Sequence, residues 1–119
     1  MPIYEELTNI ILKTEGVAKI LREKLTKIGD IKTAFIYGSF ASKKAGIKSD
    51  LDLFIIGKIE EKKFIIFINK LEEELTREIN YVLFDSKEFR DRIETNDPFI
   101  VNVLKEPKIM LIGDLDEFR

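Results

Sequence analysis

The sequence predicts a single α+β domain in which a mixed β-sheet of about four strands packs with helices. The chain has 119 residues, 45% of them hydrophobic, which suits one globular domain with a substantial core. Segments with apolar residues at helical spacing alternate with short apolar runs that are typical of strands. No linker, low-complexity tract or internal repeat divides the chain. We therefore expect one domain over residues 1–119, with N-terminal helices in 1–30 and a sheet-containing core in 31–113.

The N-terminal segment predicts two helices. Its apolar side chains recur at the spacing of one helix face. Gly16 interrupts this pattern, and Gly29 followed by Asp30 ends it. With Ile10, Ile11, Val17 and Leu21, these helices carry more apolar surface than one small sheet can cover, which favours a homodimer. The apolar positions at helical spacing are Ile3, Leu7, Ile10, Ile11, Val17, Ile20, Leu21, Leu25 and Ile28.

Strands and helices alternate in the rest of the chain. The first expected strand is apolar on both faces near its end, which favours a central place in the sheet. Asp85 is expected to cap one helix, and Pro98 suits the first turn of another. We expect the helices to pack mainly on one side of the sheet. The expected strands are 31–37, 50–56, 78–84 and 108–112, and the expected helices are 39–45, 60–77, 86–93 and 98–104.

Two short motifs lie where the first strand ends and the second begins. Gly38 and Ser39 close an apolar run, and Asp50 and Asp52 open the next one. Residues i and i+2 of a strand point to the same face, so the two carboxylates would sit about 6–7 Å apart at Cα. Paired carboxylates share divalent cations, and a Gly-Ser turn entering a helix offers N–H groups and a hydroxyl to phosphate. The motifs therefore predict a site for a metal–nucleoside triphosphate.

Composition excludes several kinds of chemistry. The chain has no Cys and no His, which excludes thiolate nucleophiles, disulfides and His-ligated zinc. The oxygen ligands that remain favour Mg²⁺ or Mn²⁺. The formal net charge of −2 argues against strong nucleic-acid binding.

Targeting and membrane signals are also missing from the sequence. Its first residues lack the basic and then apolar form of a signal peptide. No apolar run reaches the length of about 18 residues that a membrane span needs. We therefore expect no membrane association and a cytoplasmic location.

The motif region resembles the signature of a known superfamily. The segments AFIYGSFA at 34–41 and SDLDLF at 49–54 resemble the nucleotidyltransferase superfamily, and most closely its minimal, single-domain members. Further segments are similar to a branch in which this domain follows an ArsR-type winged-helix domain. They lie at 77–80, 86–90, 96–99 and 107–114, so the resemblance covers nearly the whole chain.

The resemblance implies a nucleotidyltransferase fold and a metal-dependent transferase activity. A hydroxyl of an acceptor would attack the α-phosphate of a nucleoside triphosphate, expected to be ATP, and pyrophosphate would leave. Asp50 and Asp52 would be the catalytic pair that binds Mg²⁺ or Mn²⁺. Gly38 would let the triphosphate approach the backbone, and Ser39 would donate to a phosphate oxygen.

Two more residues are implied as nucleotide contacts. Ser49 would cap or orient Asp50. Lys43, with Lys44 beside it, would supply positive charge, because minimal members commonly have Arg at the position of Ser42. The alternative is that both lysines are solvent-facing loop charges.

The third carboxylate of active members is absent. The position that matches it on the neighbouring strand is Asn80, whose neutral oxygen would hold the nucleophile-activating metal less firmly. Glu78 lies on the same face and is a possible substitute, but its Cα is a further 6–7 Å or so along the strand. Whether the chain is an enzyme therefore stays open. The alternatives are a catalytically weak or inactive nucleotide-binding module, and an antitoxin-like partner of a HEPN-type protein, which rests on family analogy alone.

Overall fold

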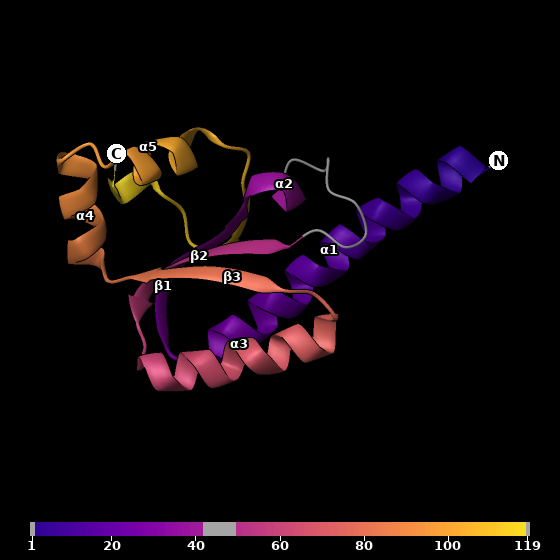
Figure 1. The fold of residues 1–119 in the computed structure, drawn as a ribbon, viewed down its shortest axis with the longest axis horizontal. Coiled ribbons are helices and arrows are strands. Elements are labelled where there is room, and N and C mark those ends of the chain that lie inside the picture. Colours follow the sequence, from indigo (N-terminus) through magenta and orange to yellow (C-terminus); the bar gives the residue numbers. More distant parts are fainter. Residues whose placement is uncertain (1, 42–49, 119) are drawn as a thin grey trace.

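The structure is a computed structural model that describes residues 2–41 and 50–118, with side chains described from residue 15 onward except at 39 and 117. Helices and strands alternate through these ranges (Figure 1). In chain order the elements are α1 (Pro2–Ile28), β1 (Asp30–Tyr37), α2 (Gly38–Ala41), β2 (Leu51–Lys58), α3 (Glu61–Leu75), β3 (Ile79–Phe84), α4 (Ser86–Glu94), α5 (Pro98–Lys105), β4 (Ile109–Ile112) and the 3₁₀ helix η1 (Asp116–Phe118).

The strands form one mixed sheet in the order β3-β2-β1-β4. β1 runs antiparallel to both β2 and β4, whereas β2 runs parallel to β3. The predicted α+β class, the mixed four-stranded sheet and the central place of β1 are confirmed. These pairings bring the end of β1 and the starts of β2 and β3 to the same end of the sheet.

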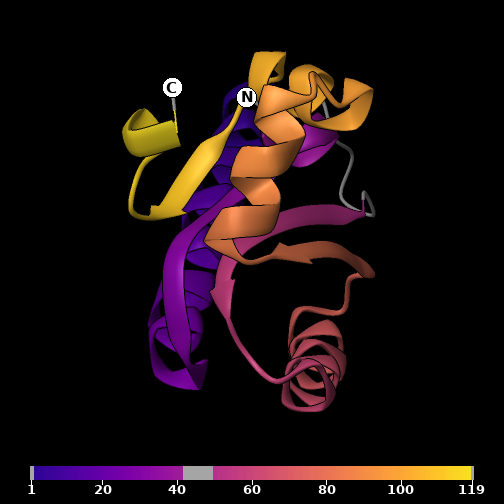
Figure 2. The same cartoon turned by 90° about the vertical axis from the view of Figure 1, so that its left-hand side faces the viewer.

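Helices cover both faces of this sheet (Figures 1 and 2). On one face, Leu25 of α1 and Phe64 of α3 are buried in a cluster with Leu53 of β2. On the other face, Phe89 of α4 is buried in a second cluster with Phe54 of β2. The expectation that helices pack mainly on one side is wrong, because β1 and β2 are apolar on both faces and each face must be shielded from water.

The expected pair of N-terminal helices is a single helix, α1, which continues through Gly16. A Cβ added at Gly16 would meet no atom within 4 Å, so the position lies on open helix surface. Glycine inside a helix costs only about 0.5–1 kcal/mol relative to alanine. Burial of Leu21 and Leu25 further along the same helix outweighs that cost. No described helix is both long and apolar enough to cross a membrane.

The expected helix caps are present. The Asp85 carboxylate accepts the backbone N–H of Glu88 at 2.8 Å, and the Glu88 carboxylate completes a capping box. The Asp97 carboxylate caps α5 by accepting the backbone N–H groups of Phe99 and Ile100. The third helix ends at Leu75, earlier than expected, because Thr76 takes a left-handed conformation with φ of 51° and its N–H donates to the carbonyl of Glu72.

The continuity of α1 can be tested at its glycine. We expect Gly16→Ala to raise the free energy of unfolding by about 0.5–1 kcal/mol, because alanine restricts the unfolded chain and suits a helix interior. Urea unfolding followed by circular dichroism measures the change. A loss of stability would contradict a continuous helix and place a turn at Gly16.

Candidate functional site

One row of side chains crosses three strands at the end of the sheet where β1 ends and β2 and β3 begin. In register, Tyr37 pairs with Asp52 across the antiparallel strands, and Asp52 pairs with Asn80 across the parallel strands. Paired residues of neighbouring strands share a face. This face is the one covered by α4 and α5, because the next row toward the middle of the sheet includes Phe54 of the second cluster.

The Asp52 carboxylate packs directly against Gly38. The backbone of Gly38 has a φ of +74°, which residues with a side chain rarely adopt. A Cβ at this position would lie 2.5 Å from Oδ2 of Asp52. Glycine is therefore required by the backbone turn into α2 and by the carboxylate beside it. The sequence suggested a different reason, namely room for a triphosphate.

Asn80 lies beside Asp52, at the position that matches the third carboxylate of active family members. Its Nδ2 donates to Oδ1 of Asp52 over a long distance of 3.4 Å. The side chain thus presents a hydrogen-bond donor to Asp52 in this arrangement. Asn80 can offer its amide oxygen in the same direction only if the amide rotates by half a turn.

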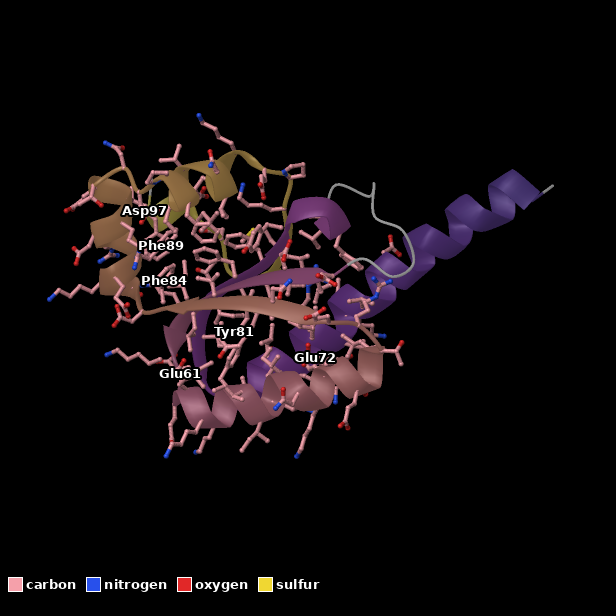
Figure 3. The ribbon with its side chains drawn as sticks, viewed as in Figure 1. Glu61, Glu72, Tyr81, Phe84, Phe89 and Asp97 are labelled. Atoms are coloured by element: carbon pink, nitrogen blue, oxygen red, sulfur yellow. The ribbon has the colours of Figure 1, made fainter. Side chains whose placement is uncertain are left out.

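Hydrogen bonds with β2 and with α3 hold the start of β3, which fixes the position of Asn80. The backbone N–H of Leu51 donates to the carbonyl of Glu78 at 2.9 Å. The backbone N–H of Ile79 donates to Oε2 of Glu72 at 2.8 Å, and Figure 3 shows Glu72 on α3 beneath this strand. The two bonds hold β2 and β3 in register at the site.

The comparison with protein families decides the family of this chain. Residues 16–114 match the family model described as Polymerase beta, Nucleotidyltransferase. The chain belongs to the nucleotidyltransferase family. The match contains Gly38, Asp52 and Asn80, and it confirms the superfamily to which the sequence motifs pointed. The likeness to the ArsR-fused branch stays a prediction.

Solved structures share the fold of this nucleotidyltransferase domain. A crystal structure of a mutant of the toxin–antitoxin MntA-HpeT is similar over 88% of this chain and 77% of its own, with 13% sequence identity and a TM-score of 0.56. A second mutant of that toxin–antitoxin matches 87% of this chain and 75% of its own, with 15% identity and a TM-score of 0.53. No curated protein matches the chain.

The remaining predicted site residues are only partly described. Asp50 is exposed and immediately precedes β2, while Glu78 is exposed and immediately precedes β3. Ser39 follows Gly38 in α2, but its side chain lies outside the described residues. Ser49 and Lys43 lie outside them altogether. The structure therefore brings together Gly38, Asp52 and Asn80 and leaves the other roles as predictions.

The oxygen atoms of this candidate site suit a hard divalent cation. Asp52 is half-buried next to the exposed Asp50. Among the side chains that the structure describes in 15–41 and 50–118, no three acidic, His or Cys groups gather closely enough to form a complete metal-binding cluster. A cation held by the two aspartates would draw its other ligands from water, from a bound triphosphate and from a rotated Asn80 amide.

Tyr37 is a member of the site that the motifs did not reveal. Its phenol is half-buried, and the pKa is raised to about 12 because burial disfavours the phenolate and because the carboxylates of Asp52 and Glu106 repel it. Glu106 follows α5, so a second element contributes negative charge to this end of the sheet. Strand register could have identified Tyr37, because the residue before Gly38 pairs with the second aspartate. No local pattern points to Glu106.

The contact between Gly38 and Asp52 generates the first prediction for the site. We expect Gly38→Ala to lower the free energy of unfolding by about 1–2 kcal/mol from backbone strain alone, with a further loss from displacement of the Asp52 carboxylate. Urea unfolding measures the change. Gly16→Ala is the matched control, since the same substitution there should act in the opposite direction. Unchanged stability of the Gly38 variant would contradict the described turn.

The charge around Tyr37 generates the second prediction for the site. Ultraviolet titration of the tyrosinates should show one group ionising near pH 12, and Tyr37→Phe should remove that step. The folded pKa exceeds the unfolded value of about 10, so this group loses its stabilising effect as the pH rises from 10 toward 12. Asp52→Asn should lower the pKa of Tyr37. An unchanged pKa of Tyr37 in that variant would show that the Asp52 carboxylate does not act on the phenol.

Proposed function

We propose that this nucleotidyltransferase domain transfers a nucleoside monophosphate from ATP to a hydroxyl acceptor in a Mg²⁺- or Mn²⁺-dependent reaction. The observation that carries the proposal is the Asp52 carboxylate seated on Gly38, at the turn into α2 and two residues after Asp50. Membership of the nucleotidyltransferase family supports it. When bound, the metal would supply charge neutralisation for the triphosphate and a lower pKa for the acceptor hydroxyl.

The chain's own residues would bind and orient the nucleotide. Asp50 and Asp52 would hold the cation, and the backbone N–H groups at Gly38 and Ser39 would face the phosphates. Ser49 and Lys43 would add a hydroxyl and a positive charge, as the family resemblance implies. The acceptor oxygen would form a bond to the α-phosphorus while the bond to the β-phosphate oxygen breaks. Pyrophosphate would then leave.

Asn80 favours a second candidate function, a module that binds the metal–nucleotide with little or no chemistry. Its amide donates to Asp52 and carries no charge, so a second cation beside Asp52 would lack an anionic ligand. Activation of the acceptor hydroxyl depends most on that cation. Glu78 would have to supply the missing anionic ligand, but its side chain is exposed at a position before β3 begins.

A protein partner is part of the proposal. The two solved structures with the same fold are described as a toxin–antitoxin. We propose that this domain also belongs to a toxin–antitoxin pair. Its partner would be a HEPN-type protein, as the family analogy implies, and that protein would also be the acceptor. The homodimer expected from the apolar N-terminal segment stays a prediction, which sedimentation would test.

Two substitutions in the row of polar side chains separate the candidate functions. With ATP labelled at the α-phosphate, Asp52→Asn should reduce transfer to a HEPN-type acceptor on the order of 100-fold or more, since the metal loses an anionic ligand. Asn80→Asp should raise transfer roughly tenfold or more, because it supplies a negative charge at the third ligand position. ATP labelled at the γ-phosphate is the control and should leave no label.

The outcomes of that assay are distinct. Calorimetric binding of Mg–ATP without transfer by either the wild type or Asn80→Asp would favour the binding module. If the wild type binds no Mg–ATP, both candidate functions are wrong.

A further inference from the structure

An aromatic ring with an open face lies beside the row formed by Tyr37, Asp52 and Asn80. Phe99 of α5 is 41% exposed, although it is a large apolar residue. The centroid of its ring lies 6.3 Å from that of Tyr37 and 6.3 Å from that of Phe54. Tyr37 pairs with Asp52 in the strand register, so Phe99 contacts the direct neighbour of the candidate metal ligand.

Core packing explains the inner side of this ring and leaves its outer side open. α5 fills the core with Ile100 and Val103, both of which are buried. Beneath them, the rings of Phe35 and Phe54 stack at 5.0 Å with an interplanar angle of 6°. Phe99 continues this aromatic layer outward, with its ring nearly parallel to that of Phe54 at an interplanar angle of 18°. Burial in the hydrophobic core therefore does not account for its exposed face.

The backbone of Phe99 is held firmly. Oδ1 of Asp97 accepts the N–H of Phe99 at 2.9 Å, and Nη1 of Arg92 donates to Oδ2 of Asp97 at 2.7 Å. Partial burial opposes ionisation, but the hydrogen bonds from Arg92 and from the backbone of Ile100 and Phe99 lower the pKa of Asp97. The Arg92 guanidinium in turn lies 4.7 Å from the ring centroid of Phe84, and Figure 3 shows Phe84, Phe89 and Asp97 on this side of the sheet.

We propose that Phe99 and Tyr37 form a nucleobase-binding subsite, in which the open face of Phe99 stacks on the purine of the nucleotide. The inference rests on the proposed function, because it requires the phosphates to lie at Asp50 and Asp52. Beyond Asp52, the β3 side of the row presents Asn80, which is exposed at the sheet's edge strand. The β1 side presents two aromatic rings, one of them open. A base directed toward β1 gains a stacking surface that the β3 side does not offer.

A stacking surface of this kind predicts a preference for purines. Every base has a π-face, but a purine covers more of an aromatic ring than a pyrimidine does. Since the cap formed by Asp97 fixes the backbone of Phe99, little conformational entropy is lost when a base stacks on it. We therefore expect ATP and GTP to bind more tightly than UTP or CTP.

Calorimetry with Mg²⁺ and a non-hydrolysable ATP analogue tests the subsite, with magnesium tripolyphosphate as the probe that lacks a base. Phe99→Ala should weaken binding of the analogue about tenfold to a hundredfold and leave tripolyphosphate binding unchanged. Phe99→Leu keeps apolar bulk on the surface and should show the same loss without disturbing the fold. Phe99→Tyr should bind as the wild type does.

Ile66→Ala provides the matched control, because Ile66 is 57% exposed on α3, over the other face of the sheet. Wild-type affinity of Phe99→Leu and Phe99→Ala for the analogue would overturn the subsite while leaving the proposed function standing. Equal loss of analogue and tripolyphosphate would also overturn it. If the wild type binds neither probe, both the proposed function and the subsite are wrong.

Discussion

The contact between the Asp52 carboxylate and the backbone of Gly38 is the constraint on which the site depends. It requires a residue without a side chain and a φ of +74° at the turn from β1 into α2. It also requires β2 to start beside that turn, which the antiparallel register of β1 and β2 provides. Any residue other than glycine would push the carboxylate away. The fold thus places an acidic group beside the turn that we propose binds phosphate.

The two-sided sheet explains why this carboxylate lies at the rim of the core. One face is closed by α1 and α3, so β1 and β2 are anchored through buried apolar side chains. The other face is closed by α4, α5 and η1 over an aromatic layer that includes Phe35 and Phe54. The polar row lies one step beyond that layer, which leaves Asp52 half-buried while the strands that carry it stay rigid.

Much of this arrangement could be predicted from the sequence, for local reasons. The interest of Asn80 followed from the family resemblance, which implied a third site position on the strand next to that of Asp52, and the parallel register of β2 and β3 pairs the two residues. The break predicted at Gly16 was wrong because one glycine in an exposed helix position costs little. Tyr37, Glu106 and Phe99 come together from segments far apart in the chain, and no local pattern encodes their proximity. The family match supports the fold and the family, whereas the chemistry depends on these individual side chains.

The most direct test of the account is to count Mn²⁺ ions in crystals of the wild type grown with a non-hydrolysable ATP analogue, by anomalous scattering. We predict an ion between the triphosphate and the carboxylates of Asp50 and Asp52. A second ion beside Asn80 would favour the transferase, and a single ion would favour the binding module. A bound nucleotide with no ion in contact with Asp52 would contradict the site itself.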